Sequence, residues 1–142
     1  MSLIVFDTAL KQGGIVFWDG EIKWVKERSK LSLTELHELF CIPDVIVAEE
    51  VQLFSAGKAA LAAKYQAKGQ LEAFAAVCGK EINWVSAKKW QKALGFAKDG
   101  RTDYQWKKYL WEQAQEVHAC TKESADAVLI THYYVENELS NV

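Results

Sequence analysis

Four acidic residues in this chain stand where folding could bring their carboxylates together. Asp7 and Glu49 each end an apolar run, and Glu123 and Asp126 open the last helical segment. A carboxylate at a strand end is held by the sheet behind it, which suits Mg²⁺, an ion that needs well-ordered oxygen ligands and keeps positions for phosphate. We therefore expect a metal site suited to phosphodiester hydrolysis. Without the other three acids, Asp7 would be interpreted as a turn-capping residue.

Short apolar runs predict the strands that would position these acids. Asp19 and Gly20 predict a two-residue hairpin turn, so that the first three strands form an antiparallel meander. A fourth run is apolar throughout, which indicates a strand covered on both faces. The expected strands cover residues 2–7, 15–18, 21–25, 44–49 and 82–85.

Helical patterns fill most of the remaining chain. Ser32 and Glu35 form a capping-box pattern, an Ala-rich stretch predicts one long helix, and Ser86 and Thr102 are expected N-caps. The expected helices cover residues 33–41, 56–78, a short basic segment after Ser86, 103–118 and 122–136.

The order of these elements predicts an α/β fold with a mixed five-stranded sheet, an antiparallel meander plus parallel strands, flanked by helices. The first strand can lie centrally beside the fourth, which would place Asp7 and Glu49 on adjacent strands. Glu123 and Asp126 are three residues apart, so we expect them to share one helical face that points at the same sheet edge.

The composition predicts a single domain over residues 1–142. Half of the residues are apolar, only one is Pro, and no low-complexity stretch is present. We expect neither a signal peptide nor a membrane span at the N-terminus, because Asp7 interrupts the first apolar run. Three cysteines without CxxC spacing argue against a disulfide framework and against a zinc site, so a cytoplasmic location is expected.

The net charge of −2 conceals two segments of opposite charge. Residues 80–108 carry a local charge of +5, and residues 112–142 carry −5. A basic segment beside an acidic site suits a metal nuclease, because Lys and Arg hold the phosphate backbone while carboxylates hold the metal. Taken alone, the basic segment is explained equally well as a solvated helix face.

The motifs, taken in order, resemble those of the RuvC-like Holliday junction resolvases of the RNase H-like superfamily, in particular the short phage-type members. Residues 3–14 are similar to the opening strand with its first catalytic Asp, 47–52 to the second motif, 85–95 to a segment with a Lys-Trp helix, and 123–130 to the closing motif. The chain departs from the family at Thr8, where Pro or Gly is usual, and at Glu123, where Asp is more frequent.

This resemblance implies a structure-selective endonuclease that resolves four-way and other branched DNA junctions by paired nicks. Asp7, Glu49, Glu123 and Asp126 would be its catalytic residues and metal ligands, with two Mg²⁺ or Mn²⁺ ions per site about 4 Å apart. The motif favours Glu49 over Glu50, which we interpret as a solvated or salt-bridged acid. The resemblance also implies a homodimer, because paired nicks need two sites on one symmetric substrate.

Basic residues on the long helix and in the basic segment are the expected phosphate contacts. Phe54 is a candidate wedge that unstacks bases at the junction centre, with a packing anchor as the alternative. The tryptophans, by contrast, are expected to be buried rather than to stack on bases. The expected DNA-binding residues are Phe54, Lys58, Lys64, Lys88, Lys89, Lys92, Arg101, Lys107, Lys108 and Lys122.

Two other functions are compatible with the same residues. The four carboxylates would equally serve another RNase H-like nuclease, one that cuts RNA in an RNA/DNA hybrid or trims flaps. The chain could also be a non-catalytic DNA-binding module of the same fold. The retained acids argue against that module, because carboxylates that face DNA repel it unless a metal is bound.

Overall fold

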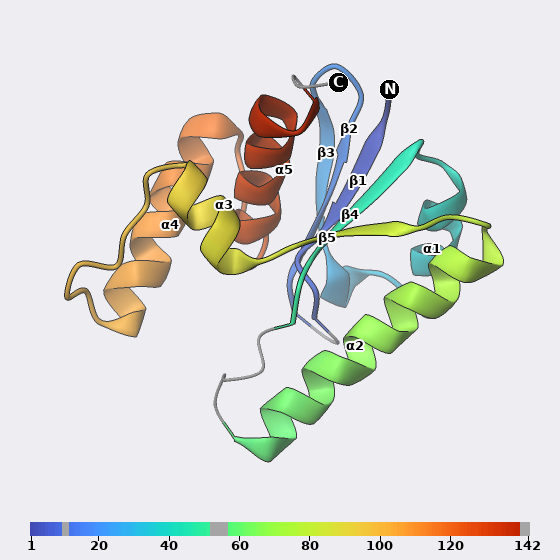
Figure 1. Cartoon of the computed structure of the whole chain (residues 1–142), viewed down its shortest axis with the longest axis horizontal. Coiled ribbons are helices and arrows are strands. Elements are labelled where there is room, and N and C mark those ends of the chain that lie inside the picture. Colours follow the sequence, from blue (N-terminus) through green and yellow to red (C-terminus); the bar gives the residue numbers. More distant parts are fainter. Residues whose placement is uncertain (10–11, 52–56, 140–142) are drawn as a thin grey trace.

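The computed structural model describes residues 1–9, 12–51 and 57–139. Within these residues, one sheet lies between two groups of helices (Figure 1). The strands are β1 (Leu3–Phe6), β2 (Gly14–Trp18), β3 (Ile22–Glu27), β4 (Val45–Glu49) and β5 (Ile82–Val85). The helices are α1 (Leu33–Glu38), α2 (Lys58–Val77), α3 (Ala87–Ala93), α4 (Asp103–Val117) and α5 (Ala125–Asn137).

The sheet has the strand order β3-β2-β1-β4-β5. Strands β1 to β3 pair antiparallel, whereas β4 is parallel both to β1 and to β5. The predicted mixed sheet, with the first strand central and next to the fourth, is therefore confirmed. The turn between β2 and β3 differs from a plain two-residue hairpin, because the register shifts between Phe17 and Trp18.

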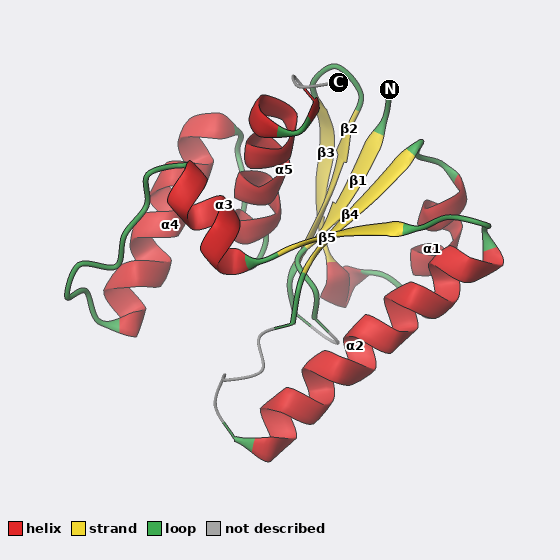
Figure 2. Ribbon diagram, viewed as in Figure 1, coloured by secondary structure: helices red, strands yellow, loops and turns green. Residues whose placement is uncertain are grey.

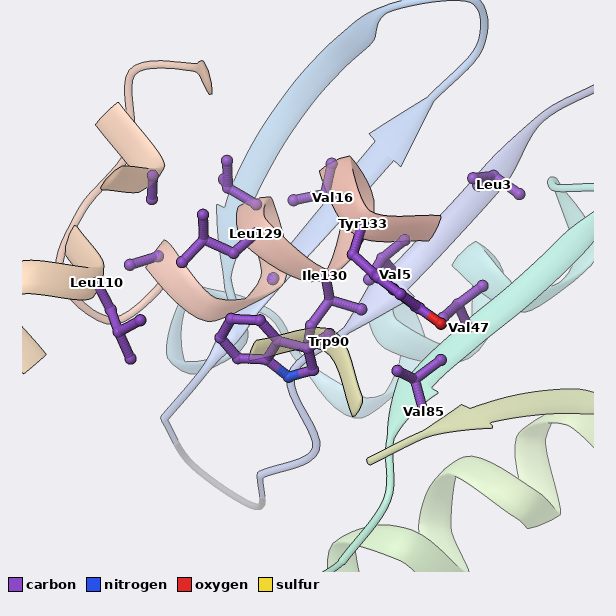
Figure 3. Packing of buried hydrophobic residues seen from close by; sticks show 14 residues of the cluster. Leu3, Val5, Val16, Val47, Val85, Trp90, Leu110, Leu129, Ile130 and Tyr133 are labelled. Carbon is purple, nitrogen blue, oxygen red and sulfur yellow. The ribbon is translucent and has the colours of Figure 1, made fainter. Parts of the chain in front are cut away.

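Alternating side chains of the strands enter two separate cores, one on each face of the sheet. Leu3 and Val5 of β1 pack with α3, α4 and α5 on one face (Figure 3). Ile4 and Phe6 of the same strand pack with α1 and α2 on the other. Figure 2 shows this three-layer arrangement of helices, strands and helices. Asp7, the residue that follows the buried strand β1, therefore lies at the carboxyl end of a sheet that helices cover on both faces.

The caps of three helices follow the sequence patterns. Ser32 with Glu35 and Thr102 with Gln105 form capping boxes at α1 and α4, and the Ser86 hydroxyl accepts a hydrogen bond at the start of α3. Helix α1 is shorter than expected, because its last turn tightens into a 3₁₀ turn over Leu39–Cys41. The last helix begins at residue 125 instead of 122.

The prediction against a disulfide is wrong. Cys41 and Cys78 form a disulfide, with their Cα atoms 5.4 Å apart, and Cys120 is free. Cys41 follows α1 and Cys78 follows α2, and both helices pack on the same face of the sheet. Sequence spacing could not show that these two helix ends meet. Disulfides persist mainly in oxidising compartments. The bond therefore does not support the expected cytoplasmic location, which stays a prediction.

The tryptophans are largely covered by the cores. Trp90 of α3 is fully buried, and the other five are partly buried. None of the helices in the described parts of the chain combines the length and the apolar character that a bilayer span requires.

Candidate functional site

The ends of β1 and β4 bring the first two predicted acids side by side. Phe6 pairs with Ala48 in the parallel register, so Asp7 and Glu49 are the next residues at neighbouring positions. The backbone N–H of Asp7 donates to the Gly14 carbonyl oxygen at 3.0 Å, and the Thr8 hydroxyl donates to the Glu49 carbonyl oxygen at 2.6 Å. These two bonds fix the strand ends relative to each other.

Helix α5 supplies the third acid from its first turn. Its start packs against β2 at Gly14, where a Cβ atom would lie 2.5 Å from the Cα of Ser124. Only glycine permits this approach, and the approach carries Asp126 to the strand ends. The ligand oxygens of Asp7, Glu49 and Asp126 all lie within 4.8 Å of one another, and all three residues are half-buried.

The structure does not bring Glu123 into this group. Helix α5 begins at Ala125, so Glu123 lies in the preceding turn and the helical spacing expected between it and Asp126 does not apply. Its side chain is exposed. Three of the four predicted acids therefore converge within the described residues.

Burial raises the pKa of each clustered carboxyl, and repulsion from neighbouring acids adds to this for Asp7 and Glu49. For Glu49, burial followed by the charge of Asp126 raises the pKa to about 7. Burial raises the pKa of Asp126 to about 6, and burial with the charges of the other two acids raises the pKa of Asp7 well above its usual range. The cluster therefore holds negative charge that the protein compensates only in part, and oxygen donors of this kind fit a hard divalent cation.

Two of the predicted cationic residues act on the cluster electrostatically. The charge of Lys64 on α2 lowers the pKa of Asp7 and of Glu49, and the charge of Lys107 on α4 lowers the pKa of Asp126. Both effects are smaller than the effect of burial, so the acid pKa values stay high.

Most of the other predicted DNA-binding residues lie on helices α2, α3 and α4. Arg101 stacks on Tyr109 at 4.1 Å from the ring centroid, and Lys122 lies 5.0 Å from the ring centroid of Tyr104. The remaining lysines are exposed on α2, α3 and α4; they are Lys58, Lys88, Lys89, Lys92 and Lys108. Phe54, the candidate wedge, lies outside the described residues.

The neighbouring acid Glu50 has a different environment. Lys68 donates to its carboxylate at 2.9 Å, and the same ammonium group lies 5.0 Å from the ring centroid of Trp84. Its interpretation as a salt-bridged acid is confirmed. Because it adjoins Glu49 but pairs with Lys68, Glu50 is a matched control for Glu49.

The sequence patterns do not predict one contact at the site, a hydrogen bond between Trp90 and Glu49. The indole Nε1 of Trp90 donates to Oε2 of Glu49 at 2.8 Å, across 41 residues of chain. The Lys-Trp pattern marks this segment, but nothing in the spacing links a residue after β5 to the acid at the end of β4. The Thr8 contact with the Glu49 carbonyl oxygen is likewise absent from the sequence pattern, which shows only that Thr8 departs from the family.

Of three comparisons with known proteins, only the comparison with solved structures found matches. No protein-family model matches the chain, and no curated protein matches it. Among solved structures, RuvC of T. thermophilus in complex with a Holliday junction substrate is 13% identical with a TM-score of 0.65, over 97% of each chain. A second Thermus thermophilus RuvC structure is 14% identical with a TM-score of 0.61, over 96% of each chain. The chain therefore has a RuvC-like fold.

Proposed function

We propose that this protein is a metal-dependent, structure-selective endonuclease that resolves four-way and other branched DNA junctions by paired nicking. The observation that carries the proposal is the convergence of Asp7, Glu49 and Asp126 within 4.8 Å at one sheet edge. The fold supports it, since one of the RuvC structures that share this fold is in complex with a Holliday junction substrate.

The donor set fits Mg²⁺ or Mn²⁺, of which we propose two per site. All three side chains offer carboxylate oxygens, and their raised pKa values reflect negative charge that a cation would relieve. When bound, such ions activate water and stabilise charge on the phosphate. The high proton affinity also means that cation binding displaces protons from the cluster near neutral pH.

We assign separate roles to the acids of the cluster and to the basic residues. We assign Asp7, whose pKa is raised by the charges of both Asp126 and Glu49, as the ligand that the two ions would share. Lys64 and Lys107 act on the cluster from opposite helices, and they are our candidates for holding the scissile phosphate beside it. The exposed lysines of α2, α3 and α4, with Arg101 and Lys122, would hold the DNA backbone, and binding should weaken steeply with salt.

Three further assignments belong to the same proposal. Residues 1–142 would form a single nuclease domain, and two copies would pair so that two sites meet one symmetric junction. Phe54 is proposed as the wedge at the junction centre, because it follows the Glu49 strand in sequence. Glu123 would act from outside the cluster, as an additional ligand or by orienting water. The cytoplasm is the proposed compartment.

A cleavage panel tests this function. Labelled immobile four-way junction, linear duplex, flap and RNA/DNA hybrid are incubated with the protein in Mg²⁺, Mn²⁺ or EDTA. We expect symmetric nicks in opposing strands of the junction, and we expect Asp7→Asn to abolish them. Cutting of the flap or hybrid alone would assign another RNase H-like activity, and tight binding without cutting at any protein concentration would assign a non-catalytic module. Glu123→Gln in the same assay tests whether that acid contributes.

A further inference from the structure

Trp90 combines complete burial with a single polar contact to the candidate site. It lies on α3 inside the core formed with α4 and α5, and its exposed fraction is 0%. Figure 3 shows its indole among the residues of this hydrophobic core, which include Ile130 and Val85. Its ring nitrogen donates to Oε2 of Glu49 at 2.8 Å.

The indole N–H can only donate, so a buried Trp needs an acceptor, and here the acceptor is a charged one. A hydrogen bond to a carboxylate is stronger than one to a neutral group. It fixes the rotation of the Glu49 side chain, which otherwise has three freely rotating bonds. The donor carries no net charge, so it orients the carboxylate without competing with a cation for the site, as an ammonium group would.

A second bond fixes the backbone of the same residue. The Thr8 hydroxyl donates to the Glu49 carbonyl oxygen at 2.6 Å, and Thr8 directly follows Asp7. The backbone of Glu49 is therefore tied to the Asp7 segment, while its side chain is tied to α3. Metal sites commonly depend on such outer contacts, which orient the ligands that touch the ion.

We propose that Trp90 is a positioning residue, which holds the Glu49 carboxylate in the orientation that receives a divalent cation, with Thr8 fixing the backbone beneath it. This inference rests on the proposed metal-dependent function. It assigns to α3 a direct part in building the site, in addition to its place in the core.

The chain provides a matched control for the indole bond. Trp111 of α4 also donates its Nε1 hydrogen, to the Cys120 carbonyl oxygen at 3.1 Å, and it packs against the same core. Trp111→Phe and Trp90→Phe therefore each remove one indole hydrogen bond from a covered aromatic side chain. Only Trp90→Phe removes a bond to an acid of the cluster.

The test is a Mg²⁺ titration of ¹⁵N-labelled protein without DNA, followed by NMR. The six Trp residues give six indole signals, and each Trp→Phe variant assigns one by its loss. In the wild type we expect the Trp90 indole signal to shift together with the amides of Asp7 and Asp126, at the same Mg²⁺ concentration, while the Trp111 signal stays in place. We expect Trp90→Phe to weaken Mg²⁺ binding about 10- to 100-fold, and Trp111→Phe to leave it within about twofold of the wild type.

A double variant separates positioning from general damage to the fold. If Trp90 acts through Glu49, then Trp90→Phe should cause no further loss of Mg²⁺ affinity in a Glu49→Gln background. Mg²⁺-dependent shifts at Asp7 and Asp126 with an unmoved Trp90 indole, or equal affinities for the two Trp→Phe variants, would overturn this inference and leave the metal site standing. No binding of Mg²⁺ or Mn²⁺ by the wild type would overturn the proposed function together with it.

Discussion

Replacing Asp126 with Asn should stabilise the metal-free protein at alkaline pH, because it removes one of three half-buried charges that repel one another. Burial and the charge of Asp126 raise the pKa of Glu49 from 4.5 to about 7, and burial raises that of Asp126 from 3.8 to about 6. A carboxyl with a raised folded pKa contributes its stability below its unfolded pKa, and this contribution is lost as the pH rises through the folded pKa. The wild type without metal should thus lose stability between about pH 4 and pH 7.

The size of the effect follows from the same pKa values. A tenfold change in proton affinity corresponds to about 1.4 kcal/mol, so ionised Asp126 costs the folded protein about 3 kcal/mol at pH 8, and ionised Glu49 a similar amount. Asp126→Asn removes the first cost and weakens the second, but the new amide still needs hydrogen-bond partners. We expect a net gain of about 1–3 kcal/mol at pH 8 and a smaller gain at pH 5.

The assay is urea unfolding followed by circular dichroism, in EDTA, at both pH values. Asp44→Asn is the matched control of opposite sign, because hydrogen bonds from Ser2 lower the pKa of Asp44, and replacing the charged acceptor with a neutral amide weakens these bonds and should destabilise the protein. Saturating Mg²⁺ should then stabilise the wild type more than Asp126→Asn. If Asp126→Asn is less stable than the wild type at pH 8 in EDTA, or if the difference between them does not depend on pH, then ionised Asp126 does not destabilise the metal-free protein in this way.

Further predictions concern two glycine positions and the disulfide. Gly14→Ala should lower the free energy of unfolding by about 1–3 kcal/mol and weaken Mg²⁺ binding, because the new Cβ atom would lie 2.5 Å from the Cα of Ser124. Gly69→Ala, in open space within α2, should instead stabilise the protein by up to about 1 kcal/mol; equal urea midpoints for the two variants would contradict this. Reduction of the Cys41–Cys78 disulfide, which closes a loop with a sequence separation of 37, should lower stability by about 4 kcal/mol. Thiol labelling of Cys41 and Cys78 in the unreduced, denatured protein would contradict the bond itself.

The arrangement of the sheet and two of its acids could be predicted from the sequence, because local patterns determine both. An apolar run that ends in Asp7, and another that ends in Glu49, indicate buried strands with carboxylates at their tips. The crossover rules then leave few ways to order the strands. Asp126 followed from a helix start that the sequence placed within three residues of its true position.

Other parts of the site depend on contacts between distant segments, which periodicity does not contain. A helix that begins at residue 122 predicts Glu123 beside Asp126, whereas the observed start at Ala125 places Glu123 in a turn. The Cys41–Cys78 bond arises because two helices end side by side. The Trp90 indole reaches Glu49 only after α3 has packed into the core.

The most direct test of the metal-site account compares two adjacent acids. Glu49 belongs to the cluster and accepts from Trp90, whereas Glu50 is paired with Lys68. Nicking of a four-way junction in Mg²⁺ would be measured for the wild type, Glu49→Gln and Glu50→Gln, each shown to be folded. We predict that Glu49→Gln slows nicking at least about 100-fold, as expected for loss of a ligand to the ions that would stabilise the reacting charge, and that Glu50→Gln stays within a few-fold of the wild type. Equal rates for Glu49→Gln and the wild type, or equal losses in both variants, would contradict the account.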